Sequence, residues 1–258
     1  MKKLTLIVTL LSILTFSVYS QETTEVLKTK KGRVIMPEAG DIGLSIDATP
    51  FLSYAGNLFN QNGNTAPTFN FTAQDPTSLT LKYFLKQDMA VRATFLLGSS
   101  RNVVNEPSIS DPKKLDKTIY SATAFGFSGG IEYSRSIKNR LRGYYGGLVG
   151  FEYLPYTDDL GNTGNVKYID AINVKNDTKI IGGNTSTIYI AGLVGVEYFF
   201  ASKISIGGEF YFSGGFGSTS ERRQTFSNGS EDNISQEKSN GMGFMTSASG
   251  ALKLSFHF

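Results

Sequence analysis

The chain has 258 residues, with 25 lysines and arginines, 22 aspartates and glutamates, 28 glycines, and no cysteine or tryptophan. This length allows one ordinary domain or two small ones. The absence of cysteine excludes disulfides, thiolate metal sites, a catalytic cysteine and a lipid-modified N-terminal cysteine. The small net charge gives no electrostatic reason to expect nucleic acid as a partner. Beyond the N-terminus no run of about 18 apolar residues occurs, which excludes a helical membrane protein for the rest of the chain.

Residues 1–20 predict a cleaved export signal. Two lysines precede an apolar stretch, residues 4–16, that is too short to span a membrane. Val18 and Ser20 supply the small side chains expected before a cleavage site. The mature chain would start at Gln21 with 23 basic and 22 acidic residues, a net charge of +1. We therefore expect the protein to act outside the cytoplasm.

Residues 21–40 are a polar N-terminal extension that contains Lys28, Lys30, Lys31 and Arg33. Two interpretations are open for it. The extension is either disordered or a contact for another subunit, and its sequence does not choose between them.

Eight segments of roughly ten residues alternate apolar and polar side chains from residue 41 onward. A period of two places one face of each predicted strand in an apolar medium and the other in a polar one. The eight segments span about residues 42–48, 79–85, 89–97, 125–133, 141–153, 188–200, 204–212 and 252–258.

The predicted connections alternate strictly between long and short. This alternation is typical of an up-and-down antiparallel barrel whose long loops all leave from one rim. An even number of strands then places both ends of the barrel at the short-turn rim. The short connections lie at 87–88, 138–140 and 201–202, and the long ones at about 50–76, 99–121, 154–186 and 214–240.

The two faces of the predicted strands differ in a way that distinguishes two kinds of barrel. A soluble barrel of the lipocalin type, or a sandwich, also alternates, but its apolar face points inward and its charges point outward. Here the polar faces hold glycine, serine, threonine and alanine with about one charge per strand, and the apolar faces have no charge in their central span. This distribution favours an apolar face directed at lipid.

Aromatic residues of the apolar faces fall at two levels, which predicts the two interfacial girdles of a membrane barrel. Near the short-turn ends lie Tyr83, Tyr133, Tyr198, Phe200, Phe256 and Phe258, and near the long-loop ends lie Phe95, Phe125, Tyr153, Phe212 and Phe244.

The C-terminal strand carries the sharpest motif, with Leu252, Leu254 and Phe256 alternating up to a terminal Phe258. It resembles the signal by which the outer-membrane assembly machinery recognises its clients. From residue 41 to 258 the chain resembles the small eight-stranded outer-membrane β-barrels of the OmpX and OmpA-transmembrane type, and most of all the family of such barrels in the Bacteroidetes. The extension, and the lack of a peptidoglycan-binding domain after Phe258, depart from parts of that group.

The resemblance implies an all-β fold, an eight-stranded antiparallel up-and-down transmembrane β-barrel with a polar, charge-paired interior. It implies an outer-membrane location, with both mature termini and residues 21–40 in the periplasm and the four long loops outside the cell. Outer-membrane lipid and, during biogenesis, the assembly machinery would be its partners.

Inward-facing positions hold one charge per strand near the short-turn half, and nearly every charge has a neighbour of opposite sign on an adjacent strand. Buried ions are tolerable only when they are paired, and the interior of an eight-stranded barrel is just wide enough for side chains to fill it. We therefore expect a closed core in which Arg92 and Arg142 bridge to Glu132, Glu197 and Glu209. These charges are Asp47, Lys82, Arg92, Glu132, Arg142, Glu197, Glu209 and Lys253, and Lys86 with Glu152 complete five cations and five anions.

A weak repeat accompanies these charges, because Gly130, Gly150 and Gly195 each lie two residues before an inward glutamate. We expect these glycines to leave room for a long arginine from the next strand.

No catalytic, cofactor or metal motif emerges from the sequence. The single histidine, His257, is expected to face inward at the short-turn mouth, away from the rim where such barrels place catalytic groups. Asp158 and Asp159 are adjacent acids of a loop, and Gly214–Thr219 lacks the lysine and the helix of a phosphate loop.

These observations predict a non-enzymatic outer-membrane barrel that acts in envelope integrity, in surface adhesion or as an accessory subunit of a larger complex. A narrow passive channel is the alternative, and a rim-located hydrolase comes third. A protein partner would bind residues 21–40 or the long loops. Alternation over residues 166–174 and 178–181 predicts a raised hairpin within the third long loop.

Overall fold

The fold consists of antiparallel β-strands, which confirms the predicted all-β class. The computed structural model describes residues 27–30, 32–48, 77–138, 140–157, 164–172, 177–226 and 233–258, so the predicted export signal lies outside the described residues. The strands are β1 (Ile42–Asp47), β2 (Thr77–Lys86), β3 (Met89–Pro107), β4 (Leu115–Lys138), β5 (Leu141–Leu154), β6 (Asn165–Ile169), β7 (Thr178–Gly182), β8 (Thr185–Ala201), β9 (Ile204–Thr219), β10 (Arg222–Phe226), β11 (Asn233–Gln236) and β12 (Ser239–His257). In this part of the chain no helix is long and apolar enough to cross a membrane.

Eight of the strands pair in a closed ring, which we call the strand ring. Each strand is antiparallel to the next in the order β1, β2, β3, β4, β5, β8, β9, β12, and β12 pairs again with β1. The closure aligns Gly43 with His257 and Asp47 with Lys253. The chain crosses between neighbours by tight turns after β2, β4 and β8, so inward residues of distant segments face one another.

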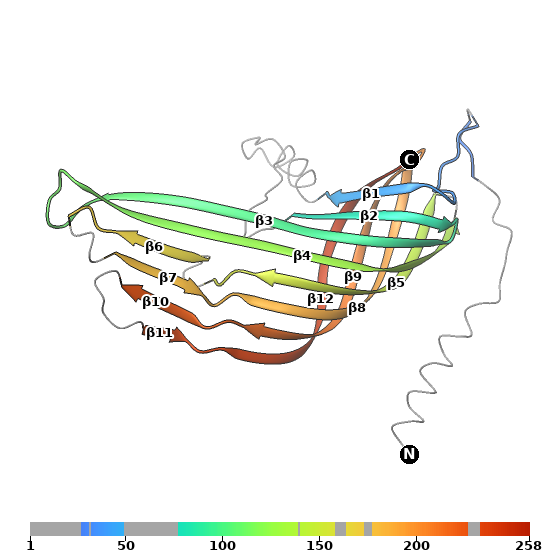
Figure 1. Cartoon of the computed structure of the whole chain (residues 1–258). Helices are drawn as coiled ribbons and strands as arrows, with labels where there is room; N and C mark the ends of the chain where they lie inside the picture. The colour runs from blue at the N-terminus through green and yellow to red at the C-terminus, as the bar shows by residue number, and fades with distance from the viewer. Residues whose placement is uncertain are drawn as a thin grey trace, which may run out of the picture.

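Four further strands lengthen the sheet on one side of the strand ring. β3 and β4 continue past the ring as a paired hairpin, and the first part of β4 pairs with β6, followed by β7, β10 and β11. Figure 1 shows this extension sheet projecting to the left of the ring. The predicted hairpin of residues 166–174 and 178–181 corresponds to β6 and β7.

The prediction of long loops at 99–121 and 214–240 was wrong. β3 runs to Pro107 and β4 starts at Leu115, while β9 runs to Thr219 and β12 starts at Ser239. Glycine, serine, asparagine and other polar residues make up most of these stretches, so the regular alternation that reveals a half-buried strand is missing there. Pairing with a neighbouring strand, rather than an apolar face, defines them.

Side chains on the strand ring alternate between an exposed outer face and a buried inner face. In β8 every second residue is buried from Ala191 to Phe199, and the residues between them are exposed. The exposed residues are apolar, with Ile190 at 67% and Val149 of β5 at 62% of their full exposure. The apolar faces therefore point outward, as the sequence predicts.

The interior is less uniformly polar than predicted. Tyr144, Leu148, Ala191 and Leu193 form a buried apolar cluster inside the ring. At the short-turn end Phe84 and Phe199 are fully buried and lie against His257. Large inward side chains fill the space beside the charged ones, because a core must reach close packing whatever its polarity.

Residues 27–30 and 32–40 form an ordered cap at the short-turn end, where Figure 1 places the first coloured segment of the chain. Ile35 and Met36 are buried against Phe199. The amide of Lys203 donates to the carbonyl of Ile35 at 2.9 Å, and the amide of Gly40 donates to the carbonyl of Phe84 at 2.7 Å. The disordered interpretation of this part of the extension was therefore wrong.

Candidate functional site

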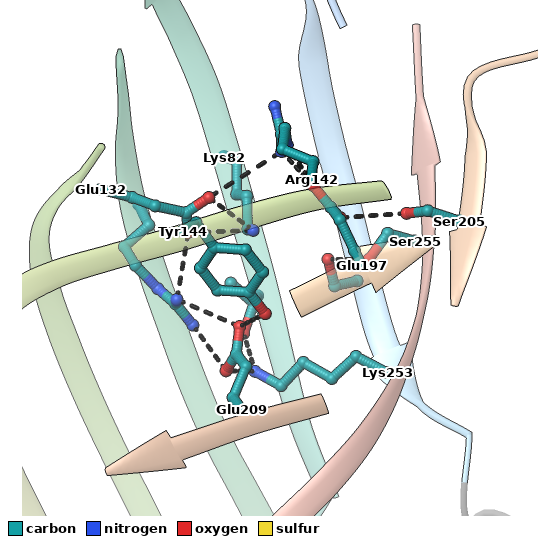
Figure 2. Close-up of polar contacts among 12 residues, drawn as sticks. Lys82, Glu132, Arg142, Tyr144, Glu197, Ser205, Glu209, Lys253 and Ser255 are labelled. Carbon is teal, nitrogen blue, oxygen red and sulfur yellow. Dashed lines mark hydrogen bonds and ion pairs between the residues drawn. The ribbon is translucent and has the colours of Figure 1, made fainter. Parts of the chain in front are cut away.

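Glu209 of β9 is the centre of a buried ion-pair network inside the strand ring (Figure 2). Both of its oxygens accept hydrogen bonds from the guanidinium of Arg92, each at 3.2 Å. Lys253 lies 2.8 Å away, and the hydroxyl of Tyr144 donates at 2.8 Å. A second tyrosine, Tyr211, also donates to this carboxylate. Two cations and two hydroxyls thus satisfy a single glutamate.

Glu132 of β4 is the second anion of the network, and it forms ion pairs with three cations. Lys82 lies at 2.9 Å, Arg92 at 3.2 Å and Arg142 at 3.9 Å. Arg92 therefore bridges Glu132 and Glu209 and couples β4 to β9 across the interior.

Glu197 of β8 is the third anion. It pairs with Arg142, whose Nε donates at 2.5 Å, and accepts from the hydroxyl of Ser205 at 3.0 Å. Arg142 also packs its guanidinium over Phe84, 5.0 Å from the ring centre. Arg142 therefore connects Glu197 of the network to Phe84, one of the aromatic residues beside the cap.

Lys86 and Glu152 depart from the expected ring of ten charges. Asp47 lies opposite Lys253 in the strand register, while Lys253 forms its ion pair with Glu209. Lys86 is exposed at the short-turn end, so it was wrongly assigned to the interior. Its position beside a tight turn and a register shift turns it out of the core.

The free-energy cost of burying this network is lower than its number of charges suggests. Lys82, Arg92, Arg142 and Lys253 face three glutamates and Asp47, giving four cations and four carboxylates. Desolvating each ion costs several kcal/mol. Good geometry and extra hydrogen bonds offset that cost, and here tyrosine and serine hydroxyls supply those bonds to the carboxylates. Such a set holds the strands in one register.

A cavity of about 790 Å³ opens on the long-loop side of the network, and we call it the vestibule. Tyr211 and Lys253 of the network line one end of it. Serine, threonine and tyrosine residues recur in its wall beside apolar ones, and Glu152 is the only acidic residue that lines it among the described residues. The lining hydroxyl residues include Ser78, Thr94, Ser128, Thr185, Thr187, Ser213, Thr219 and Ser239.

Two of the three glycines of the weak repeat, Gly150 and Gly195, accommodate tyrosines rather than arginines, which corrects the sequence interpretation. Tyr189 lies directly opposite Gly150 in the register of β5 and β8, and a Cβ atom at Gly150 would lie 2.5 Å from the tyrosine ring. Tyr144 covers Gly195 in the same way. Each tyrosine lies flat on the backbone of the neighbouring strand, which only glycine permits.

His257 is buried between Phe84 and Phe199, each with its ring centre 5.5 Å from the imidazole. Neither imidazole nitrogen has a hydrogen-bond partner. The Gly214–Thr219 segment is part of β9 and pairs with β8 and β12, so it forms no phosphate loop.

Asp158 and Asp159 lie outside the described residues. Among the residues that the structure describes, no three His, Asp or Glu side chains gather as metal ligands would.

The outer face carries aromatic pairs at two levels. On the short-turn side Tyr133 stacks on Tyr145, with 6.0 Å between the ring centres. Tyr145 was not among the residues predicted for this level. On the long-loop side Phe125 stacks on Tyr153 at 5.1 Å, and Phe95 contacts Phe127 at 5.3 Å. Tyr83, Tyr198, Phe200 and Phe212 are exposed on the outer face, Phe256 is partly buried, and the side chain of Phe244 lies outside the described residues.

The C-terminal strand closes the strand ring. Leu254 and Phe256 of β12 are the register partners of Ile46 and Leu44 in β1. Leu252 precedes this pairing, and Phe258 follows it with 74% of its surface exposed. The motif singled out in the sequence therefore lies at the seam between the first and the last ring strand.

Asp116 of β4 attaches the hairpin of β6 and β7 to the extension sheet. Its carboxylate accepts the amide of Ala171 and the hydroxyl of Tyr168, both at 2.9 Å. The amide of Ala171, and then the hydroxyl, lower the pKa of Asp116 below its ordinary value. The same contact raises the pKa of Tyr168, because its hydroxyl donates to the carboxylate.

No protein-family model matches the sequence, and no curated protein is similar enough to match it. Function must therefore be inferred from three features of the chain: its apolar outer face, its buried network and its vestibule.

Proposed function

We propose that the protein is an integral outer-membrane β-barrel with a closed core that acts without catalysis. The observation that carries this proposal is the outer face of the strand ring, where large apolar side chains are exposed and the charges lie inside. The aromatic levels at Tyr133 with Tyr145 and at Phe125 with Tyr153 would mark the two lipid interfaces.

Exposure of this face to water would be costly. Burial of apolar surface stabilises by about 25 cal/mol per Å², and soluble monomers rarely expose a contiguous apolar patch of more than a few hundred Å². A closed ring of strand pairings also suits lipid, because backbone groups at an open sheet edge would have no partner there. A soluble lipocalin-type barrel would have the opposite arrangement of its two faces.

In this proposal the cap and both mature termini are periplasmic, and the extension sheet projects from the cell. The network of Glu132, Glu197 and Glu209 fills the interior, so the barrel serves as a scaffold rather than as a pore. A rigid scaffold that presents a sheet outside the cell suits adhesion, envelope integrity or an accessory role in a larger complex. The cap or the extension sheet would be the surface for a partner protein.

Membrane fractionation combined with a heat-modifiable gel shift tests the proposal. The expected result is a protein in the outer-membrane fraction that migrates faster before boiling than after it. A protein that stays soluble after export would contradict the membrane assignment. Steady single-channel conductance of the purified protein in a planar bilayer would contradict the closed core and support the channel instead.

A further inference from the structure

Glu152 is an interior carboxylate without a cation, and it lies in the wall of the vestibule. It is the third residue from the long-loop end of β5, above the level of the network. Its side chain accepts a hydrogen bond from Tyr189, which is itself hydrogen-bonded to Ser128. Because Tyr189 is held flat against Gly150, these groups form a built arrangement rather than a set of mobile side chains.

No lysine or arginine of the described residues forms an ion pair with Glu152. Lys253 lines the vestibule but is engaged by Glu209 and Thr80. Lys86, the cation that would balance the interior charge, is exposed at the opposite end of the strand ring. Residues 49–76, 158–163 and 244–251 contain no lysine or arginine at all.

The remaining lining defines what could fill the space. Serine, threonine and tyrosine hydroxyls line the same cavity as the carboxylate, and Leu96, Leu148, Leu154 and Met242 supply apolar surface. The volume of about 790 Å³ falls in the range of small-molecule sites, which are about 300–1,000 Å³. A single carboxylate beside an apolar wall matches a ligand with one cationic group and an apolar body, and it disfavours an anion.

We propose that the vestibule binds a small organic cation, a primary ammonium attached to an apolar body. The ammonium would lie against the carboxylate of Glu152 and the apolar body against the leucine side of the wall. Both the carboxylate and the cavity belong to the strand ring itself. The proposal therefore does not depend on the membrane assignment, and fractionation and ligand binding can fail separately.

Calorimetric titration of the purified full-length protein with matched six-carbon probes tests this proposal. We expect hexylammonium to bind about tenfold or more tightly than hexanol and hexanoate, because only the cation forms an ion pair with the carboxylate. Equal binding of hexylammonium and hexanol, or tighter binding of hexanoate, would overturn the proposal. This comparison uses the unaltered protein and needs no variant to fold.

The variant Glu152→Gln then tests whether this carboxylate binds the ammonium. We expect it to weaken hexylammonium binding about tenfold and to leave hexanol binding unchanged, whereas the control Glu221→Gln should leave both unchanged. Glu221 is an acid of the extension sheet region that pairs with Arg223 on the surface. An unchanged hexylammonium affinity in folded Glu152→Gln, with folding checked by the heat-modifiable shift, would overturn the assignment to this carboxylate.

Discussion

Glu209→Gln should be the most disruptive isosteric substitution in the strand ring. The change removes one negative charge and adds no volume, so packing against Tyr144 and Tyr211 is kept. Arg92 and Lys253 lose the carboxylate that they share, at 3.2 and 2.8 Å. Arg92 keeps Glu132 as a partner, whereas Lys253 keeps among its described contacts only the hydroxyls of Thr80 and Tyr211.

The magnitude follows from the burial of these ions. Glu209 and Arg92 are each 1% exposed and Lys253 is 7% exposed, so water cannot replace the lost partner. Removing one partner of a buried pair costs about 3–5 kcal/mol, much of it from the cation left behind. Because Arg92 keeps a second glutamate, we expect a loss near the lower end of that range. The double variant Glu209→Gln with Lys253→Met should recover part of the loss, since it removes the unpaired charge.

Urea unfolding in lipid vesicles, followed by the heat-modifiable gel shift, measures these free energies. Glu221→Gln is the matched control: it breaks an ion pair in which Arg223 is 53% exposed, and such surface pairs contribute about 0–1 kcal/mol. If Glu209→Gln loses no more stability than this control, the network does not stabilise the strand ring. If the double variant is less stable than the single one by the full cost of a second lesion, Lys253 is not paired through Glu209.

Three further predictions concern the outer face, the extension sheet and the cap. Val149→Lys lies midway between the two aromatic levels of β5 and should destabilise the protein in vesicles by about 2–4 kcal/mol. The same change at Val103, on β3 beyond the strand ring, should cost less than about 0.5 kcal/mol in the same urea titration. Asp116 has a lowered pKa in the folded chain, so its contribution is present above its ordinary value of 3.8 and is lost as the pH falls below it. The NMR signals of the β6–β7 hairpin should therefore shift as the pH is lowered below that ordinary value, and Asp116→Asn should remove that transition. Ile35→Ala opens a cavity against the interior and should cost the cap about 2–5 kcal/mol; proteolysis of the N-terminal segment should speed up, while Glu38→Gln, at an exposed position, leaves it unchanged.

The orientation of the ring strands could be predicted because burial in a sheet has a period of two. Outward Val149 and inward Glu152 follow from their spacing alone, since an odd separation of three residues places them on opposite faces. Charges were equally informative: a buried ion needs a partner, so the signs of Arg92 and Glu132 on adjacent strands already indicate a contact. Both arguments use only local spacing and the cost of burial.

Features that depend on three-dimensional packing could not be predicted in this way. Phe84 and Phe199 have inward parity, but nothing in their spacing shows that they meet His257 and the cap. Residues 27–30 and 32–40 have no periodic pattern, and their order comes from two buried side chains and from backbone bonds to Phe84 and Lys203. The glycine positions were misassigned because a tyrosine and an arginine can both use the space left by a missing Cβ.

The unpaired carboxylate of Glu152 shows why a charge count and a structure lead to different conclusions. From the sequence alone, Lys86 balances it and the interior appears neutral. In the structure Glu152 and Lys86 lie at opposite ends of the strand ring. A residue beside a tight turn, such as Lys86, can direct its ammonium into water at small cost. The carboxylate of Glu152 lies on the inner face near the long-loop end of β5, so hydroxyls, water or a ligand in the vestibule must satisfy it. The hydroxyl of Tyr189 supplies one hydrogen bond to a group that can accept several, and the space beside it is where a cation would add stability.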